Sequence, residues 1–337
     1  MARIHRISGS TQYLLNGIKP INGKKPATLD ELHHLHSHHE EILTETRIII
    51  TRQQDEIILL LSNSELQLEK ELQDGIAKRT EEVDQGINDL NEKVSTANNF
   101  VTRTICKVYC GIAVSFRNYN IHSQFSGKVR ELHNIQYNKR KQIENKSSII
   151  SSECNNVVRS YEFLKNNESF LVGADGEEYV MDILSQLPDE YHVINDVNLH
   201  FQKAIHWRER NEYIRNCQID HIVIGPTGII LVETKNWKAS DIKLKSDELT
   251  HQVRRASLSL WYYLKNYYQR GNSPKIHNVI VSMKGSPTGR KPDKFIDIVA
   301  PHQLCGYITS RRGQLTEDTI NRLVDLLDRS PRSYSRF

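Results

Sequence analysis

Two acidic residues and one lysine interrupt an otherwise apolar part of the chain. Asp220, Glu233 and Lys235 lie in two β-branched runs on either side of a Gly-Pro-Thr-Gly segment at 225–228. This pattern is typical of a β-hairpin. If the hairpin is symmetric about the bond between Pro226 and Thr227, Asp220 and Glu233 lie directly opposite each other, and Lys235 emerges on the same face of the sheet. The sequence therefore predicts two carboxylates and one ammonium at a single point.

The charge of this predicted cluster is not balanced. Two carboxylates about 4 Å apart repel by about 4 kcal/mol at an effective dielectric of 20, and Lys235 offers one positive charge against two negative charges. Mg²⁺, which is bound by carboxylates and substrate phosphates, would supply the missing charge; it would also polarise a phosphoryl oxygen and activate water. Lys235 would then orient or deprotonate the water, or stabilise charge that develops on the phosphate. The alternative is a buried salt bridge that fixes the register of the hairpin.

The sequence around this hairpin resembles a known family. The spacing Asp-x12-Glu-x-Lys resembles the PD-(D/E)xK nuclease superfamily, and the longer run from Gln218 to Trp237 resembles the nuclease-related domain, NERD. Upstream, the Gly-Ala-Asp-Gly-Glu segment at 173–177 resembles the motif that opens the first helix of that domain. The resemblance covers roughly residues 170–310 and does not extend to the first half of the chain.

The resemblance implies a metal-dependent phosphodiesterase that uses Mg²⁺ or Mn²⁺, with DNA favoured as substrate and endonuclease action expected. Asp220 and Glu233 would be metal ligands, and Glu177 would be a third ligand from the first helix. Lys235 would serve the attacking water. Gln252 matches a glutamine on the helix after the hairpin and would position water or substrate.

Basic residues outside this cluster are candidates for nucleic-acid contact. The segment 200–215 is expected to be a loop, and it contains Lys203, Arg208 and Arg210 with aromatic residues between them. Such a composition suits phosphate contact and base stacking, while a plain surface insertion is the alternative. Arg255 shares the polar face of the following helix with Gln252. Because the formal net charge is only +4, nucleic-acid affinity must come from local patches.

The first half of the chain has a different pattern. Pro20 and Pro26 come early, and no further proline occurs before Pro188, which favours long helices. Apolar residues alternate at spacings of four and three, as in a coiled coil: Ile76, Thr80, Val83, Ile87, Leu90, Val94, Ala97 and Val101. We expect a helical hairpin or stalk that forms a homo-oligomer or docks a partner; an intramolecular bundle is the alternative.

The second half is expected to alternate helices and strands as an α/β fold. The predicted elements are a helix over 176–187, a strand over 191–199, the two hairpin strands, a helix from Leu249 to Tyr267, strands over 276–283 and 295–299, and a helix over 316–328. This order is the α-β-β-β-α-β core of the restriction-endonuclease-like fold. We therefore divide the chain into an unassigned segment (1–26), a helical module (27–168), the NERD-like domain (169–310) and a C-terminal helix and tail (311–337).

Composition also suggests where in the cell the protein is located. No segment reaches the roughly 18 uncharged apolar residues needed to span a bilayer, and five cysteines at scattered spacings suggest a reducing environment. We expect a cytoplasmic protein with no membrane partner. The histidines of 33–39 could share a metal or sense pH, but a solvated helical face is the more ordinary interpretation.

A nuclease joined to a helical module suggests bacterial defence against phage or foreign DNA, with a helicase or another defence protein as a partner. The rival hypothesis is a protein that binds nucleic acid without cutting it, or a scaffold, whose coiled coil mediates self-association or partner binding. The retained Asp220, Glu233 and Lys235 favour the enzyme.

Overall fold

The computed structural model describes residues 1–238, 246–265, 275–284, 294–312 and 315–329. The chain forms two compact units. The sheet unit comprises Met1–His39 and Val158–Phe337, and the helical unit comprises Glu40–Val157.

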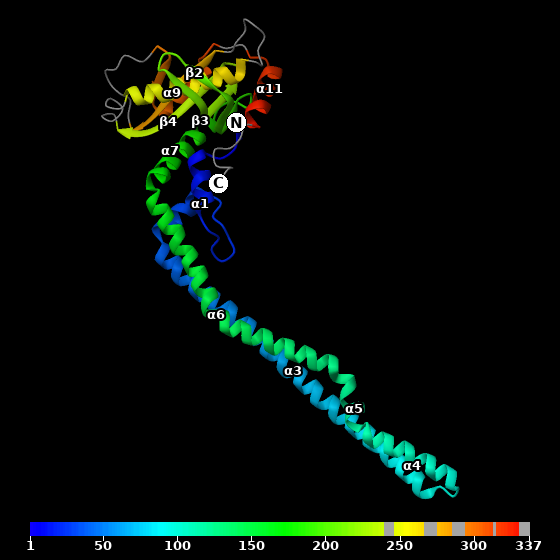
Figure 1. Ribbon diagram of the computed structural model, residues 1–337. Helices are drawn as coiled ribbons and strands as arrows, with labels where there is room; N and C mark the ends of the chain where they lie inside the picture. The colour runs from blue at the N-terminus through cyan, green and yellow to red at the C-terminus, as the bar shows by residue number, and fades with distance from the viewer. Residues whose placement is uncertain (239–245, 266–274, 285–293, 313–314, 330–337) are drawn as a thin grey trace. The chain divides into compact units, whose positions relative to one another are not determined.

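The sheet unit is built on a mixed sheet of six strands in the order β1-β2-β3-β4-β5-β6 (Figure 1). The strands are β1 (Arg3–His5), β2 (His192–Trp207), β3 (Glu212–Gly225), β4 (Gly228–Lys238), β5 (Ile276–Lys284) and β6 (Ile296–Val299). Strands β2, β3 and β4 are antiparallel, whereas β1 pairs parallel with β2 and β4, β5 and β6 are mutually parallel. Helix α7 (Glu168–Ser185) precedes β2, and α9 (Ser246–Leu264) connects β4 to β5. The predicted α-β-β-β-α-β order and the α/β class are thus confirmed; Tyr267, expected on the long helix, lies outside the described residues.

The central hairpin has the register expected from its sequence. Gly225 pairs with Gly228, and the ladder continues to the pair His221 and Val232. The next pair in this register is Asp220 and Glu233. A Cβ atom at Gly225 would lie 2.2 Å from the ring of Tyr191, so close packing at the turn requires glycine there.

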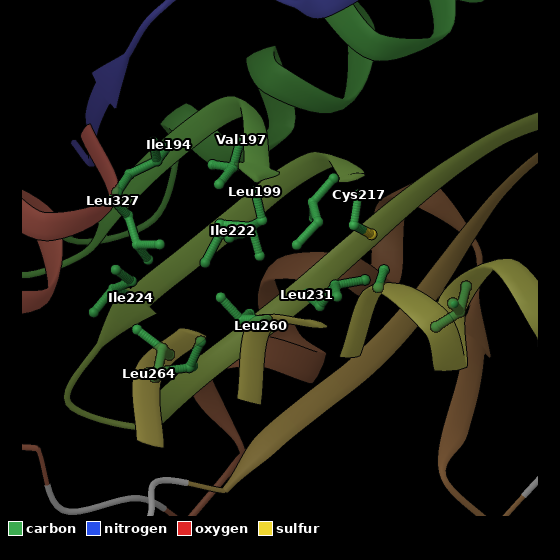
Figure 2. Packing of buried hydrophobic residues seen from close by; sticks show 14 of the residues in the cluster. Ile194, Val197, Leu199, Cys217, Ile222, Ile224, Leu231, Leu260, Leu264 and Leu327 are labelled. Carbon is green, nitrogen blue, oxygen red and sulfur yellow. The ribbon is translucent and has the colours of Figure 1, made fainter. Parts of the chain in front are cut away.

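Both faces of the sheet are buried, which explains why its strands read as nearly continuous apolar runs. On one face, α9 and α11 (Glu317–Asp328) pack over Ile222, Leu231 and their neighbours, as Figure 2 shows for Leu260 and Leu327. On the other face, α7 and α10 (Leu304–Thr309) cover Val223 and Val232. The rigid two-sided core holds the ends of β3 and β4 in place.

The segment 200–215 is not a loop, and this prediction was wrong. Strands β2 and β3 continue as a long hairpin in which His200 pairs with Asn216 and Ile205 with Ile214. A register shift between His200 and Ile205 interrupts the alternation of buried and exposed residues, so the strand period is hard to detect in the sequence. The connecting turn is only 208–211.

The N-terminal segment joins the sheet unit. Strand β1 pairs with β2 at the edge of the sheet, and α1 (Gly9–Gly17) follows with Ser8 as its N-cap. Helix α2 (Leu29–Ser37) begins at the N-cap Thr28, whose hydroxyl accepts a hydrogen bond from the Glu31 amide. In the histidine cluster, His33 lies 2.6 Å from Asp175 of α7.

The helical unit is a long hairpin, which confirms the expected all-α module. Its elements are α3 (His39–Thr96), α4 (Phe100–Ser115), α5 (Arg117–His122), a short 3₁₀ turn η1 (Ser123–Phe125) and α6 (Ser126–Asn166). Helices α3 and α6 run side by side (Figure 1) and are joined by the ion pairs Asp55–Lys146, Glu65–Lys139 and Glu71–Lys128. The predicted seam is half-buried from Ile76 to Ala97. None of the helices in the described part of the chain is long and apolar enough to cross a membrane.

Candidate functional site

The predicted catalytic and metal-binding residues converge on one pocket. Its volume is about 530 Å³, and it is lined by Glu177 of α7, Asp220 of β3, Glu233 and Lys235 of β4, and Gln252 of α9. Two strands and two helices therefore each contribute to the same concave surface. Glu177 and Gln252 are far apart in the chain, and they meet here because their helices pack beside the sheet that carries the other three residues.

Glu233 lies at the centre of this cluster and is only 1% exposed. Its Oε1 atom accepts a hydrogen bond of 2.6 Å from Lys235 Nζ and another of 2.6 Å from Gln252 Nε2. Its Oε2 atom is buried and accepts no hydrogen bond from any residue that the structure describes. A buried carboxylate oxygen without a donor is costly, and this atom is therefore suited to a positively charged ligand.

Asp220 is held beside Glu233 by the backbone of β4. Its Oδ2 atom accepts a hydrogen bond of 3.1 Å from the amide of Thr234. The regular ladder between β3 and β4 stops one pair earlier, at His221 and Val232, and the Asp220 side chain takes the place of the next backbone acceptor. The carboxylate is thereby fixed at the end of the paired region, at the edge of the pocket.

Glu177 is held by the N-terminal helix α1. Its carboxylate accepts a hydrogen bond of 2.6 Å from Ser10 Oγ and one of 3.2 Å from the Ser10 amide. Ser10 lies in the first turn of α1, where free amides and the helix dipole favour a negative charge. A Cβ atom at Gly9 would lie 2.8 Å from Asp196 Oδ1, so the absence of a side chain lets this turn approach the sheet.

Ser10 is the contact that sequence reasoning missed. The N-cap at Ser8 and the run Ser8–Thr11 signal the start of a helix, but nothing local relates that helix to a glutamate 167 residues later.

Burial and mutual repulsion raise the pKa of two acids in the pocket. Burial, reinforced by the charge of Asp220, raises the pKa of Glu177 to about 7 and the pKa of Glu233 to about 8. Burial alone would favour the neutral amine of Lys235, but the charges of Glu233 and Asp220 outweigh it and raise the pKa of that lysine. Lys235 is therefore an ammonium at neutral pH. In the absence of a further cation, Glu177 and Glu233 therefore bind protons near neutral pH.

The residues present fit a divalent cation. Glu177, Asp220 and Glu233 offer hard carboxylate oxygens, and the Oε2 atom of Glu233 is buried without a hydrogen-bond donor. As the side chains stand, no group of three or more histidine, cysteine, aspartate or glutamate residues in the described part of the chain is arranged to hold a metal ion. The fit is therefore one of ligand chemistry, and water or substrate oxygens would have to complete the coordination.

The four basic residues expected to contact nucleic acid do not line this pocket. Lys203, Arg208 and Arg210 are exposed near the end of the β2–β3 hairpin. Arg255 donates from Nε to Glu212 Oε1 at 2.7 Å and from its terminal nitrogen to the carbonyl of Asn216 at 2.9 Å. Its guanidinium braces α9 against β3.

His221 also interrupts the apolar run of β3, but it belongs to the core. It is fully buried, and its Nδ1 atom lies 2.7 Å from Asn195 Oδ1. Burial lowers the pKa of His221 to about 4, so the ring is neutral near pH 7. Its side chain faces Asn195 and does not line the pocket.

Comparison with known proteins identifies this part of the chain. Residues 172–283 match the family described as the nuclease-related domain, NERD. The family expected for the C-terminal half is confirmed. The matched segment contains all five residues of the pocket that were predicted from the sequence, whereas Ser10 and α1 lie outside it.

Part of the chain is also similar to a protein of a bacterium. An uncharacterized protein of Bacillus anthracis is 40% identical over 67 residues, a stretch that covers 20% of this chain and 27% of the relative. The match thus spans about a quarter of the relative's length.

The raised pKa values predict how stability depends on pH. Glu177 and Glu233 have an ordinary pKa of 4.5 and titrate near 7 and 8 in the folded protein, so the folded state holds protons that the unfolded chain has released. The stability they contribute is therefore fully present below about pH 4.5 and is lost as pH rises toward 8. In EDTA, we expect the melting temperature to fall by several degrees between about pH 5 and 8. We expect Mn²⁺ to restore most of this loss at pH 8 and little at pH 5, because metal binding displaces the protons.

The control is Glu233→Gln, which cannot ionise and should flatten the decline in EDTA. A metal-free protein whose stability stays constant or rises over this pH range, or a Mn²⁺ effect independent of pH, contradicts the electrostatic description.

A second prediction concerns Ser10. A hydrogen bond to a carboxylate favours its charged form, so Ser10→Ala should raise the pKa of Glu177 further. The pH at which Mn²⁺ first stabilises the protein should then move upward by a fraction of a unit. Thr11→Ala is the matched control: Thr11 lies in the same helical turn and donates to Glu178 Oε1 at 2.9 Å, outside the pocket. Both variants should lose about 1 kcal/mol of stability, and equal pH shifts in the two would refute a specific role for Ser10.

Proposed function

We propose that the nuclease-related domain is a nuclease that hydrolyses phosphodiester bonds with Mg²⁺ or Mn²⁺, and that DNA is its favoured substrate. The observation that carries the proposal is the convergence of Glu177, Asp220 and Glu233 in one pocket with Lys235 beside them, together with the orphaned oxygen of Glu233. A structural salt bridge would pair its charges and leave no such oxygen. One buried and two half-buried acids against one ammonium suit a site that awaits further positive charge.

Glu177, Asp220 and Glu233 would hold the cation. When bound, a divalent cation polarises a phosphoryl oxygen and lowers the pKa of water. Hydrogen bonds hold two of these carboxylates in place: Ser10 donates to Glu177, and the Thr234 amide donates to Asp220. These contacts orient the carboxylates before substrate arrives and thereby reduce the cost of arranging the site.

Lys235 would act as a cation and hydrogen-bond donor. Its pKa is raised, so near neutral pH it holds its proton and is poorly suited to remove one from water. Its contact with Glu233 places the ammonium at the pocket wall, where it would orient the attacking water and stabilise negative charge that develops on the phosphate. Of the roles considered from the sequence, we therefore favour orientation and charge stabilisation. Gln252 would hold the rotamer of Glu233 by donating to the same oxygen.

We also propose that the helical unit self-associates. Ile48, Leu59 and Leu66 of α3 are 63%, 59% and 68% exposed, and their spacings of eleven and seven residues are close to whole helical turns. Arg52 and Glu56, of opposite charge, flank this exposed α3 face and line a groove of about 660 Å³ beside it. A second copy would cover the apolar residues and match the charges.

A cytoplasmic role in bacterial defence against foreign DNA, alone or with a helicase or another defence protein, is the setting that we propose. Its support is analogy: a nuclease-related domain is joined to a long helical unit of the kind that positions or regulates an enzyme.

Cleavage assays test the enzymatic proposal. Purified full-length protein is incubated with supercoiled plasmid and with labelled single-stranded DNA and RNA, in Mg²⁺, Mn²⁺ or EDTA. We expect metal-dependent cleavage with preference for DNA, and a loss of about 10²–10³-fold in Glu233→Gln and Lys235→Met, because each removes a charge at the site of reaction. Glu190→Gln and Lys19→Met, at exposed positions of the same unit, should retain full activity.

Equal behaviour of the wild type and both site variants would contradict the proposal. If the wild type also bound oligonucleotides without cutting them, the non-cleaving alternative would replace it.

Sedimentation equilibrium tests self-association. We expect the wild type to form at least a dimer at micromolar concentration and Leu59→Glu/Leu66→Glu to be monomeric, since each glutamate would be buried unpaired in the interface. Tyr137→Glu, at an exposed aromatic of α6, is the control and should not change the mass. A monomeric wild type would refute this part of the proposal.

A further inference from the structure

A second pocket lies along another side of helix α9. Its volume is about 400 Å³, and Arg254, Leu258 and Trp261 of α9 line it. Their spacings of four and three residues place them on one side of the helix. Gln252, which lines the first pocket, is two residues from Arg254 and therefore projects about 200° away around the helix axis. The two pockets share α9, but in the described part of the chain they have no residue in common.

Aromatic rings line this second pocket, which we call the aromatic pocket: Trp207 of β2, Trp261 of α9 and Phe295. Trp207 is only 6% exposed, and its ring stacks on that of His251 with 5.1 Å between the centroids. Trp261 and Phe295 are 42% and 53% exposed. Flat apolar ring faces that remain in contact with water inside a concave surface are suited to a planar ligand.

Asn278 supplies an unpaired acceptor in the aromatic pocket. It lies on β5 between Ile276 and Ile280, on the face of the sheet that α9 covers, and it is 7% exposed. Its Nδ2 atom donates to the carbonyl of Phe295 at 3.0 Å, which fixes the orientation of the amide. Its Oδ1 atom is buried and accepts no hydrogen bond from any residue that the structure describes. Because such an oxygen is costly, it is suited to an N–H group of a ligand.

The charged residues at the aromatic pocket have a small excess of positive charge. Arg254, Lys275 and Glu209 line it, and Lys294 Nζ lies 4.8 Å from the centroid of the Phe295 ring. Glu209 lies 3.6 Å from Arg254 and offsets part of this charge. Lys275 is exposed at the rim. Charge alone therefore does not select the ligand, but it permits a phosphate beside Lys275.

We propose that the aromatic pocket binds an unpaired base of a single-stranded nucleic acid. A base offers flat faces to Trp261 and Phe295, N–H groups to Asn278 Oδ1, and a phosphate to Lys275. An apolar side chain of a protein would leave Asn278 unpaired, and an inorganic anion would leave the rings uncovered. A base that is stacked and paired within a duplex has neither its faces nor its pairing edge free, so the strand must be single here.

The inference goes beyond the proposed function, because it concerns binding and holds whether or not the nuclease-related domain cuts. It also differs from the contacts expected from the sequence. Lys203, Arg208 and Arg210 do not line the aromatic pocket, whereas Trp207, from the same segment, does. The expectation of base stacking in that segment thus becomes a proposal for this tryptophan, with partners on α9 and β5 that lie far away in the sequence.

Oligonucleotide titrations of the full-length protein test the proposal. The titrations are done in EDTA, which prevents metal-dependent cleavage, with labelled oligo(dC), oligo(dT) and duplex DNA of equal length and with deoxycytidine monophosphate. We expect single strands to quench tryptophan fluorescence, and duplex and mononucleotide to bind about tenfold more weakly or worse. Oligo(dC) should bind several-fold more tightly than oligo(dT), because cytosine offers an amino group where thymine offers an oxygen.

Variants assign the binding to this pocket. Trp261→Ala and Phe295→Ala should each weaken binding of oligo(dC) about tenfold, and Trp261→Phe, which keeps a ring, should retain most of it. Asn278→Leu should lose the preference for oligo(dC). The matched control is Tyr262→Ala: this residue follows Trp261 on α9 and is 37% exposed, but its ring contacts Phe201 and does not line the pocket. It should bind as the wild type does, and melting temperatures confirm that all variants are folded.

Several results would overturn the proposal. Equal affinity of the wild type and Trp261→Ala, or an equal loss in Tyr262→Ala, would show that the strand does not stack in this pocket. Equal affinity of the wild type for oligo(dC) and oligo(dT) would contradict the role of Asn278 without any substitution. A mononucleotide that binds as tightly as the strand would assign the pocket to a free nucleotide instead. Binding that depends on Trp261 in a protein that does not cleave would contradict only the proposed function.

Discussion

The burial of the Glu233 carboxylate inside an apolar sheet is the constraint to which the rest of the site responds. One oxygen accepts hydrogen bonds from Lys235 and Gln252, of which only Lys235 is charged, and the other oxygen has no donor in the described structure. Moving such a group out of water is tolerated only when a cation or a proton compensates its charge. The raised pKa of Glu233 shows that protons do so when no other charge is available. The pocket is thus electrostatically incomplete, and the same incompleteness suits it to a divalent cation.

The physical unit around the site is larger than the segment that resembles the nuclease-related domain. The family match begins at residue 172, yet residues 1–39 belong to the same compact unit. Strand β1 extends the sheet, and α1 brings Ser10 to Glu177. Because a hydrogen bond from outside the matched segment holds one of the acids, a fragment trimmed to residues 172–283 would lack a support of its own site.

In the helical unit, charge organises both the contact between the two arms of the hairpin and an exposed face. Acids of α3 pair with lysines of α6, and these pairs join the two arms of the hairpin. The exposed α3 face carries both signs of charge. Electrostatic complementarity selects a partner by repelling the wrong ones, and a face that carries both signs of charge suits a second copy of the same chain.

The sequence by itself determined those features that are periodic or local. The Gly-Pro-Thr-Gly turn between two apolar runs specified the register that sets Asp220 beside Glu233, because the type and length of a hairpin turn fix which residues pair. The four-and-three spacing of apolar residues predicted the seam of α3, because that spacing places them on one side of a helix.

Only the tertiary structure decided what depends on distant segments. The contact of Ser10 with Glu177, the long β2–β3 hairpin behind a register shift, and the 60% exposure of Val101, where the predicted seam ends, have no local signal. Each arises because packing brings together, or leaves apart, residues far separated in the chain, and no local pattern records which surfaces will meet.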